Sequence, residues 1–99
     1  MMNESAAVAL WDAPAWANYR VVDEGAIEHC LPIGEIGPIE GEEPLTVEVV
    51  QRDELNLALE PASISRTPAQ IRLGGLRLSV GQVRDLVTQL NTAVELIDA

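Results

Sequence analysis

The clearest hydrophobic pattern of the sequence lies near its C-terminal end, where apolar residues recur at alternating spacings of three and four. These apolar positions are Val80, Val83, Val87, Leu90, Val94 and Ile97. Such spacing places them on one side of an α-helix, and we predict a helix over residues 79–97. Ser79 is a good N-cap, and Gln82 three residues later completes a capping box, so the sequence also predicts where the helix begins.

The apolar stripe of this helix is compatible with two kinds of packing, against a sheet or against a second helix. We favour a helix that lies across a sheet, because the stripe is wide and coiled coils usually run longer. The same positions also follow a heptad repeat, and the polar side of the helix carries few charges. The alternative is therefore that a second copy of the chain covers part of the helix, which would make the protein a homodimer. The residues of that self-association surface would be Val87, Leu90, Val94 and Ile97.

A β-hairpin is predicted immediately before the helix, over residues 71–78. The Gly74-Gly75 pair is typical of a two-residue hairpin turn. In this register Arg72 faces Arg77, and two opposed guanidinium groups are unfavourable unless an anion lies between them. We therefore predict that both arginines bind a carboxylate of the acidic half of the chain. The predicted pairs are Ile71 with Leu78, Arg72 with Arg77, and Leu73 with Leu76.

Residues 45–59 contain two runs in which apolar and polar residues alternate, the pattern of half-buried strands. A three-residue loop at residues 52–54 would place both runs on the same face and pair Val49 with Leu57. We therefore predict a hairpin whose turn is formed by Arg52, Asp53 and Glu54.

The other segments show weaker patterns. Residues 31–44 are rich in Gly and Pro and indicate short extended pieces joined by turns, and residues 61–68 read as a connector. Residues 1–30 are predicted to be irregular. Their aromatic residues include Trp11 and Trp16, which are expected to clamp this segment onto the domain or, alternatively, to anchor a protein partner.

Together these patterns predict a single α+β domain over residues 1–99. We expect a small antiparallel sheet of three to five strands packed against one long C-terminal helix. The chain then divides into an irregular N-terminal segment (1–30), a β-rich part (31–78) and the helix (79–97).

The charge of the chain limits what it can bind. The 99 residues include 16 acidic and 6 basic residues, which gives a formal net charge of −10. Eight carboxylates and no basic residue lie between Val21 and Gln51. Such a surface repels nucleic acid and anionic membranes and attracts basic protein partners. Within it, we expect Glu40, Glu42 and Glu43 to contact the partner.

Residues suited to catalysis or metal binding are few. His29 and Cys30 are adjacent, and no second His or CxxC motif exists to complete a zinc site. In a strand their side chains point to opposite faces, and acidic surroundings raise the thiol pKa, so a Cys–His nucleophile is not expected. We therefore expect no catalytic residues, no bound metal and no cofactor. A single Cys and the lack of a basic, signal-like start favour the cytoplasm.

The layout of the chain resembles a family of small uncharacterised proteins of high-GC Gram-positive bacteria and their phages. That family has a Cys-Pro-x-Trp-Cys…His start, then strands, then a strand-turn-strand followed by a helix. The segment IRLGGLRLSVGQVRDLVTQL (residues 71–90) matches its late part. The early match keeps Pro14, Trp16 and His29, but Ala13 and Ala17 stand where the cysteines would be. The resemblance implies a phage or mobile-element setting and an accessory role. Because the cysteine ligands are missing, it does not imply a bound metal.

The sequence thus favours a small, acidic, non-enzymatic module that binds and modulates another protein, with a host protein as target if the phage setting holds. One alternative is a nucleic-acid mimic that inhibits a DNA-binding protein, in which rows of exposed carboxylates replace phosphates. The other is a degenerate metal-binding protein built around His29 and Cys30.

Overall fold

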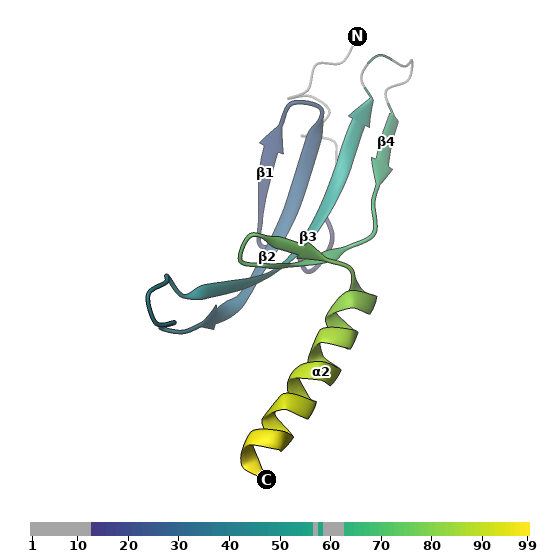
Figure 1. Ribbon diagram of the computed structural model, residues 1–99. Helices are drawn as coiled ribbons and strands as arrows, with labels where there is room; N and C mark the ends of the chain where they lie inside the picture. Colours follow the sequence, from purple (N-terminus) through teal and green to yellow (C-terminus); the bar gives the residue numbers. More distant parts are fainter. Residues whose placement is uncertain (1–12, 57, 59–62) are drawn as a thin grey trace.

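The computed structural model describes residues 13–56, 58 and 63–99 and consists of an antiparallel sheet followed by one helix (Figure 1). The predicted α+β class is confirmed. The elements are β1 (Tyr19–Asp23), β2 (Ala26–Ile36), β3 (Leu45–Asn56), β4 (Ser63–Arg66), β5 (Gln70–Leu73), β6 (Leu76–Leu78) and α2 (Val80–Asp98).

The sheet is an antiparallel meander with the order β1-β2-β3-β5-β6, and β4 also pairs with β3. One edge of β3 therefore pairs with two strands: β5 lies against Val47–Val50, and β4 lies against Asp53–Asn56. Thr67 bridges the break between β4 and β5, because its backbone N–H and its hydroxyl both donate to the carbonyl of Arg52. This arrangement places the two longest strands, β2 and β3, at the centre.

The predicted turn at Arg52, Asp53 and Glu54 is wrong, because β3 runs without interruption through these residues. Alternate residues of one continuous strand already share a face, so no loop is needed to align Val47 and Val49 with Leu55. Leu57, the predicted partner of Val49, lies outside the described residues. Asp53 is part of that face and is fully buried, and its strand neighbours are Ile27 and Arg66. Asp53 is thus a buried strand residue, although acidic residues at such positions are more typical of turns.

Two segments expected to lack strands contain them. β1 and the first residues of β2 lie within residues 1–30, and they form a hairpin whose turn is Glu24-Gly25. Gly25 has φ of 74°, a conformation that favours glycine. β4 lies within the predicted connector at residues 61–68. With these corrections, the sheet of the described residues has six strands.

The core is small and lies where the first half of β2 pairs with β3. The buried residues of the described structure all lie on these two strands: Ala26, Ile27, Glu28, His29, Cys30, Val50 and Asp53. Consecutive residues of a strand point to opposite faces, so burial of five in a row means that both faces of β2 are covered there. Three of these seven residues are polar or charged, which makes their pairing decisive for the fold.

The β5–β6 hairpin and the start of the helix have the structure that the sequence predicts. Arg72 lies opposite Arg77 in the predicted register, and the capping box of Ser79 and Gln82 is formed in both directions. The helix then leaves the sheet (Figure 1). It contacts β5 and β6, but Val83 and Leu86 are its only half-buried residues and none is buried.

The sheet therefore covers less of the apolar stripe than the sequence indicated. The molecule measures 63 × 26 × 21 Å and has a radius of gyration of 17.6 Å, whereas a compact domain of this length has about 13 Å. No helix in the described part of the chain is long and apolar enough to cross a membrane. The molecule is therefore elongated, and the sheet leaves most of α2 uncovered.

We expect Gly74→Ala to destabilise the fold by about 1–2 kcal/mol. Gly74 has φ of 59°, and an added Cβ would lie 2.7 Å from Cδ1 of Leu45. Gly75→Ala is the matched control, because its position has neither a positive φ nor a neighbour within 4 Å of the added Cβ. Urea unfolding of both variants measures the difference, and equal stabilities would contradict the assigned turn.

Candidate protein-binding site

The central strands carry a charged cluster on one face of the sheet, which fixes the position of the β5–β6 hairpin. Glu28 of β2 binds both opposed arginines: its Oε1 accepts from Nη1 of Arg72 at 2.7 Å, and its Oε2 accepts from Nη2 of Arg77 at 2.6 Å. The Glu28 side chain is only 11% exposed. The predicted need for an anion between the two arginines is therefore met by an internal carboxylate.

Glu48 of β3 extends this cluster toward β1. Its Oε1 accepts from Nη2 of Arg72 at 3.0 Å, and its Oε2 accepts a hydrogen bond from the Tyr19 hydroxyl. The Tyr19 hydrogen bond and the nearby Arg72 lower the pKa of the Glu48 carboxyl. The same hydrogen bond raises the pKa of the Tyr19 hydroxyl. Burial disfavours the charge of Arg72, but Glu48 and Glu28 outweigh burial and raise its pKa.

Cys30 lies within this cluster and is fully buried. Burial raises the pKa of its thiol, and the nearby Glu28 carboxylate acts in the same direction. The thiol is therefore protonated at neutral pH, the form that is a poor nucleophile and metal ligand.

A second buried cluster lies on the opposite face of the sheet. Nε2 of His29 lies 2.7 Å from Oδ2 of Asp53, and both side chains are fully buried. Arg66 of β4 binds both carboxylate oxygens of Asp53, at 2.9 and 3.0 Å. This cluster joins β2, β3 and β4. His29 and Cys30 are thus separated by the sheet, and no group of three or more potential metal ligands occurs among the described residues.

A surface suited to a partner begins where the core ends. Residues 32–44, which we call the arm, form the end of β2 and the loop that leads to β3, and every one of them is exposed. In Figure 1 this hairpin projects beyond the rest of the sheet. Its three isoleucines, Ile33, Ile36 and Ile39, are 61%, 55% and 36% exposed. Exposed apolar groups in such a row are typical of a binding surface.

The arm is also acidic. Glu40, Glu42 and Glu43 lie at its end, around a tight turn in which the N–H of Glu42 donates to the carbonyl of Ile39 at 3.0 Å. Gly41 allows this turn, with φ of 76°. Within the described part of the chain, these three carboxylates and that of Glu35 form no ion pair, unlike Glu28 and Glu48. Their charge is therefore available to a partner.

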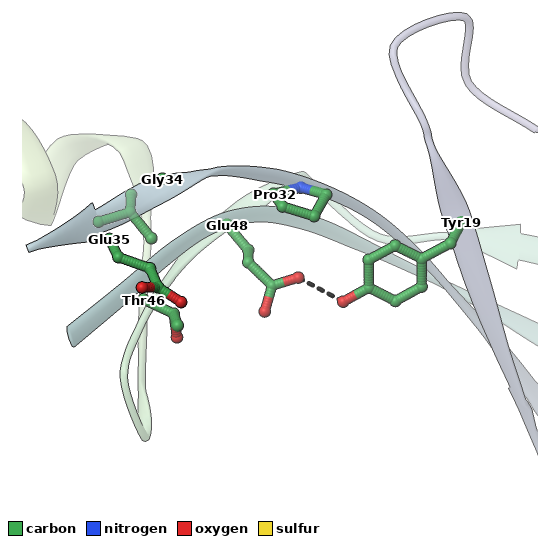
Figure 2. Close-up of a pocket in the computed structure, with 7 residues that line it drawn as sticks. Tyr19, Pro32, Gly34, Glu35, Thr46 and Glu48 are labelled. Carbon is green, nitrogen blue, oxygen red and sulfur yellow. Dashed lines mark hydrogen bonds between the residues drawn. The ribbon is translucent and has the colours of Figure 1, made fainter. Parts of the chain in front are cut away.

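A pocket of about 280 Å³ lies at the base of the arm. Figure 2 shows the carboxylates of Glu35 and Glu48 and the ring of Tyr19 on the same side of the two strands, and Pro32 pairs with Glu48 across them. The pocket thus combines apolar surface, an aromatic ring and two carboxylates. A guanidinium or ammonium group on an aliphatic stem matches this combination.

The residues singled out in the sequence fall into separate regions. Glu40, Glu42 and Glu43 lie on the arm, and Val87, Leu90, Val94 and Ile97 form the exposed stripe of α2. Trp16 is half-buried in a turn before β1, and Trp11 lies outside the described residues.

Sequence reasoning missed Tyr19, Glu35 and Glu48 as members of one pocket, and it missed the exposure of the arm isoleucines. The alternation of Ile33, Ile36 and Ile39 with Gly, Pro and Glu was the available signal. It did not show that this segment extends beyond the core, because that depends on where β1 begins beside β2, at the pair of Tyr19 with Cys30.

Glu28→Gln should destabilise the protein by about 2 kcal/mol or more, because Arg72 and Arg77 would lose the charge that holds them together. Glu54→Gln is the matched control: Glu54 is 61% exposed and lies 3.5 Å from Arg52, so its loss should cost less than about 1 kcal/mol. Chemical denaturation compares the two. Adding Arg77→Gln to Glu28→Gln should restore part of the stability, and no recovery would contradict the role assigned to Glu28.

The stability of the protein should fall on acidification partly through Glu48. Its folded pKa is lowered, so its stabilising contribution is present above the ordinary carboxyl pKa and is lost as the pH falls from there through the folded pKa. Glu48→Gln removes this contribution, and we expect a smaller decrease in the free energy of unfolding between pH 6 and about pH 3. Parallel curves for variant and wild type would refute the assignment.

Comparison of the chain with protein-family models, with curated proteins and with solved structures gave no match. The resemblance noted from the sequence therefore stays an expectation. The two surfaces of the described structure best suited to binding are the arm and the stripe of α2.

Proposed function

We propose that this protein is a non-enzymatic interaction module that uses its arm and the adjacent pocket to bind a basic segment of another protein. The observation that carries this proposal is the arm itself: residues 32–44 are all exposed, yet they combine three isoleucines with carboxylates that lack an internal partner in the described structure. A segment that bears apolar side chains and contributes none of them to the core is best explained by binding.

The edge of β2 supports the same proposal. β1 pairs with β2 only from Ala26 to Cys30, so among the described strands none covers the outer edge of β2 from Leu31 to Ile36. An uncovered strand edge presents backbone N–H and C=O groups to an extended segment of a partner. Added there, such a segment would lie next to the pocket and to the exposed isoleucines.

The pocket favours a basic side chain in that segment. Glu35 brings a carboxylate without an internal ion pair in the described structure, and the Glu48 carboxylate and the Tyr19 ring lie nearby. An arginine or lysine seated there would bury its stem against Pro32 and place its charge near Glu35. The net charge of −10 would also speed the approach of a basic partner.

The biological setting follows from the resemblance alone. A phage or mobile-element accessory protein that modulates a host protein in the cytoplasm would suit a small module of this kind. Affinity capture from the native host, followed by mass spectrometry, identifies the partner needed for the next test.

Reversing the charge of Glu40, Glu42 and Glu43 to Lys should slow association with that partner about tenfold at low salt and flatten the salt dependence, because steering depends on the charge near the contact. Adding Glu35→Lys should also speed dissociation, since it places a cation beside the pocket. Surface plasmon resonance measures both rates.

The matched control reverses Glu24, Asp85 and Glu95, which are exposed residues outside the arm, and so changes the net charge equally. A uniform effect of total charge would slow both triple variants alike, and this result would contradict a contact at the arm.

A further inference from the structure

We propose that α2 pairs with α2 of a second copy of this chain, side by side and antiparallel. The proposal is independent of the function assigned to the arm, because it concerns a different surface. It begins from the stripe that the sheet leaves uncovered: Val87, Leu90, Val94 and Ile97 are 50%, 54%, 54% and 81% exposed.

The spacing of these four residues identifies the kind of occupant. They occupy the two inward positions of a heptad repeat, at which one helix packs against another of the same repeat. Leu86 and Ala93 lie beside them and widen the surface. An isolated helix with such a stripe in water would expose more apolar surface than soluble chains usually leave uncovered, and the elongated shape of the molecule leaves this helix accessible along most of its length.

The charges of the helix favour a second copy and set its direction. In an antiparallel pair, residues face each other when their numbers have a constant sum. Facing Val87 with Ile97 also faces Leu90 with Val94, so all four residues are used in both copies. Arg84 then lies within about two residues, or 3 Å along the axis, of Asp98 of the second copy. Because the pair is symmetric, this opposite-charge contact forms twice.

A parallel pair lacks this complementarity. Equal residues would lie at equal heights, so Arg84 would lie level with Arg84 of the second copy, while Asp85 stands at the outer position of the heptad, away from the contact. The acidic ends with Glu95 and Asp98 would also come together. The sheets at the start of each helix would also meet at the same end, whereas an antiparallel pair separates them (Figure 1).

Multi-angle light scattering tests whether the pair forms. We expect a molar mass of twice the 10.7 kDa of the chain at micromolar concentrations. Leu90→Gln and Val94→Gln should each raise the dimer dissociation constant about tenfold or more, because each places a polar group at two sites of the symmetric contact. Thr92→Gln, on the other side of the helix, is the control and should have little effect.

These variants should keep the fold, since no residue of α2 is buried within one chain, and far-ultraviolet circular dichroism verifies this. A monomer at about 100 µM wild-type protein would overturn the proposal. Equal effects of Leu90→Gln and Thr92→Gln would overturn it as well.

A charge exchange tests the direction. Arg84→Glu and Asp98→Arg should each weaken the dimer, and the double variant should recover most of the affinity. Mixing the two single variants should give heterodimers in preference to either homodimer. Within one chain, residues 84 and 98 are about 21 Å apart along the helix, so an intramolecular contact cannot produce this recovery. Loss of affinity without recovery in the double variant would contradict the antiparallel pair.

Discussion

The position of the β5–β6 hairpin, and with it that of α2, depends on the carboxylate of Glu28. It lies on β2 but binds Arg72 and Arg77 of the β5–β6 hairpin, so it holds that hairpin to the sheet across the intervening strand β3. The helix follows directly from β6 and therefore takes its direction from the same contact. This cluster of three charges is stable only while Glu28 keeps its arginines, because Glu28 left alone would be a poorly solvated charge.

This dependence on charge follows from the size of the core. Ala26, Ile27, Cys30 and Val50 are the only fully buried apolar residues in the described structure, and a domain of this length has little interior to add. The clusters around Glu28 and Asp53 join strands that apolar packing alone joins weakly. Most of the exposed large aliphatic residues of the described structure lie on the arm and on α2.

Local signals predicted the parts of the fold that depend on neighbouring residues. The Gly74-Gly75 turn, the opposed arginines and the capping box at Ser79 each require only a few consecutive residues, and all are present. The failures have a different origin. Asp53 was assigned to a turn because its partners, His29 and Arg66, are 24 and 13 residues away and no local pattern links them. Likewise, the pocket requires Tyr19 of β1 to meet Glu48 of β3, which only the register of the whole sheet decides.

Binding through the arm and pairing through α2 would also affect each other. A single arm offers a partner a small contact, and small contacts of this kind give weak binding. Pairing through α2 would place two arms on one particle, separated by a pair of helices rather than by a flexible linker. A target that presents two basic segments at a matching distance would then be bound much more tightly than by one arm, since the second contact forms within the same complex. Targets with a single segment would gain nothing, so the helix would contribute to selectivity without touching the target.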